Sequence, residues 1–351
     1  MEKYRIDRSK GIEFGLYTLG DHIPNPETME RISAKQRLDE IIELAKLAEE
    51  FGLDVFSVGE SHQKYFATQA HSVVLAAIAQ ATKNIKLTSS STIISTSDPV
   101  RVYEDFSTID LISNGRVEIV AGRASRVGLF ELLGYDLKDY EGLFEEKFEL
   151  LKIINENKIV NWEGEYRAPL RNAEVLPRPL HNTLPLWRAV GGAPGSAIRA
   201  GKQGVPMMLA TLGGPSSNFK IAVDAYRKSL SESGYDPAQF PVATTGLFFT
   251  DKDSQVAMRQ AYPGVNLGLQ LVNGHGFSKQ HFAQAQDVRD ALMVGSPQQI
   301  IEKILYQYEL FGHQRYMAQM DFGGVPFPLL VKNLELIASE ILPAIRKYTK
   351  Q

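Results

Sequence analysis

The chain has 351 residues, of which 44% are hydrophobic and 23% are charged, and its formal net charge is −3. This composition is that of an ordinary globular protein, and the interspersed charges favour neither a nucleic acid nor an anionic membrane as a partner. Because the chain has no cysteine, disulfide bonds, thiolate metal sites and cysteine nucleophiles are excluded.

The first residues of the chain carry no targeting signal that we can identify. Residues 1–11 are charged and lack the apolar stretch of a secretory signal peptide. No run of about 18 apolar residues occurs elsewhere, as a membrane-spanning helix would require. We therefore expect a cytoplasmic protein.

Short apolar runs alternate with amphipathic segments along the chain. The runs that we expect to form strands are, in order, 12–19, 54–60, 85–94, 117–122, 186–190, 205–210, 242–249 and 315–320. The segments with helical spacing are 38–51, 68–82, 99–113, 142–155, 196–200, 218–233 and 328–348. Parallel strands that are covered on both faces give such nearly continuous apolar runs. The alternation predicts an α/β fold, a single (β/α)8 TIM barrel over residues 1–351.

Three longer segments are expected as insertions in this barrel. Residues 123–140 follow the fourth strand, residues 157–185 precede the fifth, and residues 260–295, with several glycines, follow the seventh. The middle segment predicts a hairpin of 160–162 with 166–168 that turns on Glu163 and Gly164. Insertions after the fourth and seventh strands lie at the functional face of a barrel, so they are candidate walls of a site.

Several polar residues stand where barrel enzymes place reactive groups, at the carboxyl ends of strands. Glu60, Ser61 and His62 follow the second strand, and Ser90 and Ser91 end the third. His62 is suited to proton transfer near neutral pH, or it is a structural, hydrogen-bonded histidine. The small serines would leave room for a flat ring against the backbone, or they simply end a strand beside a polar cavity.

The segment from Gly191 to Ser196 indicates an anion site. Glycines let the backbone approach a ligand closely, and the start of the following helix offers free N–H groups and a favourable dipole. Arg123, at the end of the fourth strand, would add a bidentate charged contact to a phosphate. The alternative is a glycine turn that joins strand to helix, with a serine at the N-cap.

Other common sites are not indicated by the sequence. The glycine patterns of dinucleotide and P-loop nucleotide sites are absent, as is the nucleophile elbow of serine hydrolases. The histidines do not share ligand spacing with carboxylates, so we expect no metal.

Taken in order, several segments resemble one known family. They are DVFSVGESH at 54–62, TSDPVRVYEDFSTIDLISNGRVEIVAGRAS at 96–125 and LWRAVGGAPGSAIRAGKQGVPM at 186–207. From about residue 12 to 345 the chain is similar to the luciferase-like, flavin-dependent monooxygenases. The similarity is specific as an ordered set of motifs.

The resemblance implies an FMN site. It implies that Arg123 and Ser196, with the backbone of Gly191, Gly192 and Ala193, hold the FMN phosphate. It further implies that Ser90 and Ser91 pack on the flavin ring, often through a cis peptide bond, and that Glu60 and His62 are catalytic residues beside it. Ser61 departs from the family pattern, because it stands where the family usually has the first histidine of a Glu-His-His motif. This departure makes aldehyde oxidation of the luciferase type doubtful.

The resemblance also implies the reaction and the partners. Reduced FMN, supplied by a separate NAD(P)H-dependent flavin reductase, and O2 would oxygenate a small organic substrate that the sequence does not identify. The family implies a homodimer, for which the apolar segment 73–81 is a candidate face unless it lies against the barrel. Three alternatives stay open: an F420-dependent dehydrogenase on the same fold, a non-catalytic flavin-binding protein and an unrelated barrel enzyme with a phosphate site.

Overall fold

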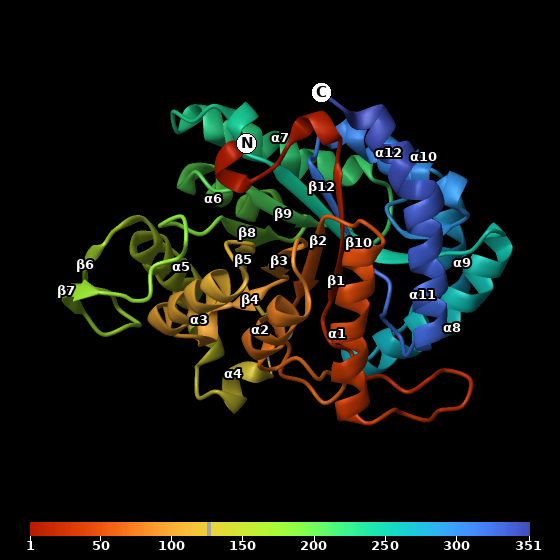
Figure 1. Cartoon of the computed structure of the whole chain (residues 1–351), viewed down its shortest axis with the longest axis horizontal. Coiled ribbons are helices and arrows are strands. Elements are labelled where there is room, and N and C mark those ends of the chain that lie inside the picture. The colour runs from red at the N-terminus through yellow and green to blue at the C-terminus, as the bar shows by residue number, and fades with distance from the viewer. Residues whose placement is uncertain (125–127) are drawn as a thin grey trace.

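The computed structural model describes residues 1–124 and 128–351, and in these residues eight parallel strands form a closed barrel (Figure 1). In spatial order they are β1 (Glu13–Thr18), β2 (Val55–Val58), β3 (Lys86–Ser89), β5 (Val117–Gly122), β8 (Leu186–Val190), β9 (Met207–Ala210), β10 (Val242–Thr250) and β12 (Arg315–Gln319). Pairing of β12 with β1, and of β9 with β10, closes the ring. The predicted α/β fold, a (β/α)8 TIM barrel, is confirmed.

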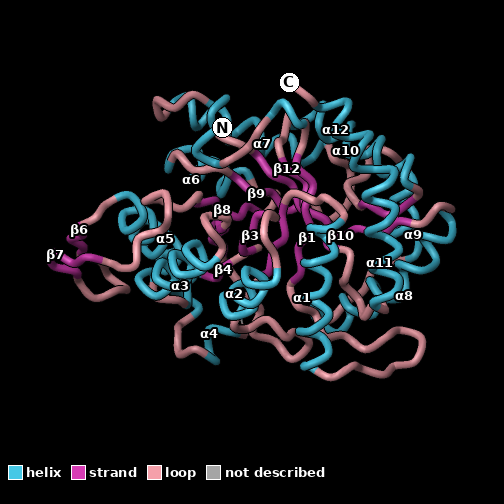
Figure 2. The backbone as a smooth tube through the Cα atoms, viewed as in Figure 1, coloured by secondary structure: helices cyan, strands magenta, loops and turns pink. Residues whose placement is uncertain are grey.

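Helices surround the barrel on its outside (Figure 2). They are α1 (Ala34–Glu50), α2 (His71–Ala81), α3 (Pro99–Ile112), α4 (Leu129–Leu132), α5 (Tyr140–Glu156), α6 (Pro194–Gln203), α7 (Ser217–Glu232), α8 (Ser254–Asn273), α9 (Lys279–Ala283), α10 (Pro297–Phe311), α11 (Phe327–Leu336) and α12 (Leu342–Thr349). The helices α4, α8, α9 and α10 are missing from our prediction, and a π-helical turn divides the single helix expected over 328–348 into α11 and α12. In the described part of the chain, no helix is both long and apolar enough to cross a membrane.

The helices form where the sequence supplies one apolar face and capping groups. In α1, Ile41, Leu44, Ala45 and Ala48 are buried at helical spacing, which fixes one side of the helix against the barrel. Asp98 caps α3 by accepting the N–H of Val100, and Pro99 occupies the first turn, where its missing N–H costs nothing.

The hairpin before β8 exists, but its second strand lies later in the chain than we predicted. Strand β6 (Ile159–Trp162) pairs antiparallel with β7 (Leu170–Glu174), not with residues 166–168. The carboxylate of Glu146 on α5 accepts the N–H groups of Tyr166 and Arg167, both at 3.0 Å. Because those backbone groups are bound to the helix, this segment makes a loop and the chain returns to pair with β6 only afterwards.

The expectation of a glycine-rich loop after β10 is wrong over most of its length. Gly264 and Gly268 lie inside α8, whose C-terminus is at Asn273. A Cβ atom on Gly264 would lie 2.6 Å from the carbonyl oxygen of Gly323, so the glycine permits close packing of α8 on the loop that follows β12. Part of the other expected insertion, residues 125–127, lies outside the described residues.

A buried ion cluster crosses the interior of the barrel. Arg315, at the start of β12, donates to both carboxylate oxygens of Glu118 on β5, at 2.7 and 3.1 Å. Its Nε donates to Glu13 on β1 at 2.8 Å, and its guanidinium lies 4.9 Å from the ring centre of Trp187. Three strands separate β12 from β5 in either direction. The contact therefore joins opposite walls of the barrel.

The cluster keeps its charges although it is shielded from water. Burial by itself would raise the pKa of Glu118, but the charge and hydrogen bonds of Arg315, with the charges of Lys86 and Arg5, lower it below the ordinary value. The same carboxylates hold the pKa of Arg315 above its ordinary value. Each charge is thus tolerated only in the presence of its partners.

A second buried cluster ties the barrel mouth to α1. Arg37 donates through Nε to the carbonyl oxygen of Asp21 at 2.8 Å and pairs with the carboxylate of Asp321. The Asp21 carboxylate accepts the N–H of Gly323 at 3.0 Å. Burial, with the nearby charge of Asp321, raises the pKa of Asp21 to about 7. Two carboxylates here share one guanidinium.

Replacement of Arg315 by leucine should lower the free energy of unfolding by about 3–5 kcal/mol, because Glu118 would be left buried and unpaired. Urea unfolding measures the change. The control is Arg171→Leu, which removes an arginine of the hairpin that pairs with the exposed Glu163 and should cost at most about 0.5 kcal/mol. A loss below about 1 kcal/mol for Arg315→Leu would contradict the structural role that we assign to it.

Replacement of Asp21 by asparagine should change the pH dependence of stability. The pKa of this side chain is about 7 in the folded protein and about 4 in the unfolded chain, so between these pH values the folded protein binds a proton that the unfolded chain lacks. The stability of the wild type therefore falls as the pH rises through this window, whereas a neutral asparagine side chain at this position is unaffected.

Unfolding free energies measured at pH 5 and pH 8 test this point. The stability of Asp21→Asn relative to the wild type should be higher at pH 8 than at pH 5, by roughly 1–4 kcal/mol. A relative stability that is the same at both pH values would show that Asp21 does not carry the raised pKa.

Candidate functional site

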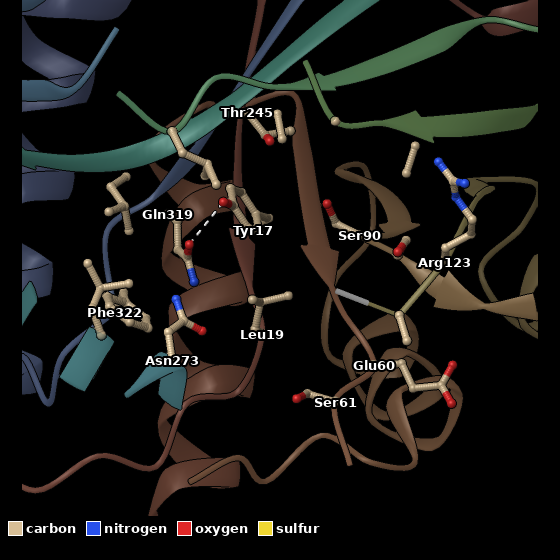
Figure 3. Close-up of a pocket in the computed structure, with 18 of the residues that line it drawn as sticks. Tyr17, Leu19, Glu60, Ser61, Ser90, Arg123, Thr245, Asn273, Gln319 and Phe322 are labelled. Carbon is tan, nitrogen blue, oxygen red and sulfur yellow. Dashed lines mark hydrogen bonds between the residues drawn. The ribbon is translucent and has the colours of Figure 1, made fainter. Parts of the chain in front are cut away.

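A cavity of about 940 Å³ lies at the carboxyl ends of the barrel strands (Figure 3). Its walls include Tyr17 on β1, Ser90 after β3, Thr245 on β10 and Gln319 on β12. The α8 region adds further side chains, among them Asn273. The volume is at the upper end of the range of small-molecule sites, so the cavity has room for a cofactor and a substrate together.

Glu60 and His62 lie together at one wall of this cavity. The carboxylate of Glu60 contacts Nε2 of His62 at 2.6 Å and accepts the N–H of Ile93 at 2.7 Å. The Glu60 side chain is buried, whereas that of His62 is partly exposed to the cavity. The carboxylate thereby fixes the imidazole and joins the end of β2 to the segment after β3.

His71 is a third member of this group, and the sequence motifs assign it no role. Its Nδ1 lies 3.8 Å from the Glu60 carboxylate, and its Nε2 is 2.8 Å from the hydroxyl of Thr92. Burial lowers the pKa of His71 below its ordinary value, so this imidazole is neutral near pH 7. His71 begins α2, eleven residues after Glu60, and no local motif shows that the two side chains meet.

Ser90 and Ser91 lie at the floor of the cavity, and the peptide bond between them is cis. Glycines flank them on both neighbouring strands. A Cβ atom on Gly122 would lie 2.2 Å from the hydroxyl of Ser91, and one on Gly59 would lie 2.4 Å from the carbonyl oxygen of Ser90. Only glycine allows this segment to pack so closely between the ends of β2 and β5.

Arg123 lies at the edge of the cavity, just after β5. Its guanidinium pairs with the carboxylate of Glu141 on α5 and lies 5.7 Å from the ring centre of Tyr140. Glu141 also pairs at 2.7 Å with Arg199 on α6. Two arginines, one just after β5 and one on α6, therefore share one carboxylate at this end of the cavity.

The helix α6 begins at Pro194, two residues earlier than we predicted, and its N-cap is Ala193, which provides no side-chain cap. The interpretation of Ser196 as an N-cap is therefore wrong. Ser196 lies in the first turn, where it is buried and its hydroxyl has no hydrogen-bond partner among the described residues. Gly191 lines the cavity, whereas Gly192 is exposed beside it.

The structure brings most of the predicted site residues to one cavity. Those that line it are Glu60, His62, Ser90, Ser91, Arg123 and Gly191. Gly192, Ala193 and Ser196 are not among the lining residues: Gly192 and the N-cap Ala193 precede α6, and Ser196 lies in its first turn. Among the residues described, no group of three or more histidine, aspartate or glutamate side chains is arranged to hold a metal ion.

Sequence reasoning missed the opposite side of the cavity. Tyr17 and Gln319 belong to strands β1 and β12, whose apolar runs showed only that strands form there. The position of Gln319 at the last residue of its strand is the one signal that would have pointed to it.

Comparison with known proteins gives a family and a full-length relative. The model of a family described as luciferase-like monooxygenase matches residues 12–314. The oxygenase component of the flavin-dependent trigonelline monooxygenase of Acinetobacter baylyi is 24% identical to this chain, over 90% of this chain and 93% of that protein.

Solved structures share the fold at low sequence identity. Monooxygenase RslO1 from Streptomyces bottropensis matches with a TM-score of 0.84 and 22% identity, over 95% of this chain and 99% of that one. The oxygenating constituent of 3,6-diketocamphane monooxygenase from Pseudomonas putida, in complex with FMN, matches with a TM-score of 0.75 and 19% identity, over 95% and 98%. An F420-dependent secondary alcohol dehydrogenase matches with a TM-score of 0.74 and 17% identity, over 95% and 99%.

Proposed function

The chain belongs to the luciferase-like monooxygenase family, and on this premise we propose that it is the oxygenase component of a two-component, FMN-dependent monooxygenase. The observation that carries the proposal is a cavity that is bounded at one edge by Arg123 and is largely apolar beyond Ser90 and Ser91. One ligand with an anionic end and a flat ring, together with a small organic molecule, matches this distribution of groups.

The residues at the Arg123 end fit the FMN phosphate. Arg123 offers a planar set of donors, and the uncapped first turn of α6 offers backbone N–H groups and a favourable dipole. The buried hydroxyl of Ser196 has no partner among the described residues, so an acceptor or donor from a ligand would satisfy it. Gly191 has open space where a Cβ would lie, which leaves the approach to the helix free.

The charge of the cavity supports FMN rather than F420. Among the described residues that line it, Arg123 is the only lysine or arginine. F420 carries a longer acidic tail, which would need several cationic partners. One arginine beside a helix start suits a single phosphate.

Reduced FMN, when bound, would supply the two electrons with which O2 delivers one oxygen atom to the substrate and the other to water. The side chains of this protein would position the reactants and move protons. His62, held at Nε2 by Glu60, has Nδ1 left to exchange a proton with the cavity. Ser61 stands in the place of the first histidine of the family motif, so His62 is the imidazole from this segment that lines the cavity.

We propose a separate NAD(P)H-dependent flavin reductase as the transient partner, in the cytoplasm. The words "oxygenase component" in the name of the Acinetobacter relative support this arrangement.

We also propose a homodimer that forms through the outer face of α2 and α3. Val73 on α2 is 67% exposed and Leu111 on α3 is 45% exposed, whereas Leu75 and Ile78 on α2 are buried.

Replacement of Arg123 by alanine should weaken FMN binding by about 10- to 100-fold, because a charged hydrogen bond to the phosphate contributes about 1.5–3 kcal/mol. Quenching of FMN fluorescence during titration measures the dissociation constant. Riboflavin, which lacks the phosphate, should bind the variant and the wild type equally. The matched control is Arg171→Ala on β7, which should leave FMN affinity unchanged.

Two results would overturn parts of this proposal. Equal FMN affinity of Arg123→Ala and the wild type would refute the phosphate assignment. A wild type that binds F420 but neither oxidised nor reduced FMN would refute the choice of cofactor.

A further inference from the structure

One buried polar group that lines the cavity has no hydrogen-bond partner among the described residues. The hydroxyl of Tyr17 donates to Oε1 of Gln319 at 2.9 Å. The Gln319 side chain belongs to a residue that is only 5% exposed, and its Nε2 has no hydrogen-bond partner among the described residues. Figure 3 shows this amide on the side of the cavity opposite Arg123.

The bond from Tyr17 fixes which end of the Gln319 amide meets a ligand. The phenol donates to the carbonyl oxygen, so the NH2 group is the end that remains. Buried amide donors are rarely left without an acceptor. An acceptor atom of a bound molecule would complete this site.

The surroundings of Gln319 indicate an uncharged acceptor. Figure 3 shows Phe322 and the amide of Asn273 on the same side of the cavity as Gln319, and Leu247 and Leu269, which also line the cavity, belong to the same apolar cluster as Phe322. Among the described residues that line the cavity, the lysine, arginine, aspartate and glutamate residues are Glu60 and Arg123, and Figure 3 shows both on the side away from Gln319. A charged substrate would therefore lack a counter-ion here, whereas a carbonyl oxygen needs only a donor.

We propose that Gln319 determines specificity by donating a hydrogen bond to the carbonyl oxygen of a neutral substrate, a ketone with an apolar ring or chain. The apolar part of the substrate lies against Leu247, Leu269 and Phe322. Tyr17 acts as a positioning residue, because it orients the amide. This inference rests on the proposed function, in which FMN occupies the cavity from Arg123 to Ser90.

Paired ligands that differ in one carbonyl group test the inference. Isothermal titration of the FMN-loaded protein compares 1-indanone with indane, which has the same ring system without the oxygen. The wild type should prefer the ketone. Gln319→Met, which keeps the length of the side chain but has no donor, should weaken 1-indanone binding by about 3- to 10-fold and leave indane binding unchanged.

The matched control is Gln63→Met, because Gln63 lines the same cavity and should not alter the preference for the ketone. A second measurement needs no variant. The carbonyl stretching band of 1-indanone bound to the wild type should lie at a lower wavenumber than the band of the ketone in cyclohexane, since a hydrogen bond weakens the C=O bond.

Each contrary result has a distinct meaning. If the FMN-loaded wild type shows no preference for 1-indanone, or binds neither compound, the inference is overturned while the FMN assignment stands. If Gln319→Met lowers FMN affinity and leaves the ketone preference unchanged, the amide serves the flavin and the inference is again wrong. If the wild type binds no FMN, the proposed function itself has failed.

Discussion

The guanidinium of Arg315 spans the interior of the barrel, and the geometry of the site depends on that contact. It holds Glu118 on the opposite wall and Glu13 on the neighbouring strand. Since none of these charges is stable in the interior without its partners, strands β1, β5 and β12 are fixed relative to one another. Their carboxyl ends carry Tyr17, Arg123 and Gln319, so the same contact sets the spacing across the cavity.

The cavity itself is assembled from chain segments that are far apart in sequence. Glu60 joins the end of β2 to the segment after β3 through Ile93, and the glycines beside Ser90 and Ser91 let that segment lie between two strands. At one edge, Glu141 pairs with both Arg123 and Arg199 of α6. At the other, Tyr17 orients Gln319. The two ends therefore differ in chemistry, cationic at one and uncharged at the other.

The sequence was sufficient for the barrel strands because each is a local apolar run, and most of the surrounding helices show a local period. The helix α10 was missed although its period and its capping box are local. The sequence failed where distant contacts decide the structure. Residues 166–168 look like a strand, but Glu146 binds their N–H groups, and Gly264 looks like a loop residue although it serves the packing of α8 on Gly323.

The same distinction applies to the site. Arg123, Glu60 and His62 follow strands directly and were predicted from position and from family motifs. The roles of His71 and Gln319 depend on side chains that only the fold brings near, so no motif marks them.

A crystal structure of the FMN complex tests the proposed cofactor site most directly. We predict the phosphate between Arg123 and the first turn of α6, with the ring on Ser90 and Ser91. A phosphate bound at the Gln319 end, or a cavity without FMN at saturating concentration, would contradict the proposal.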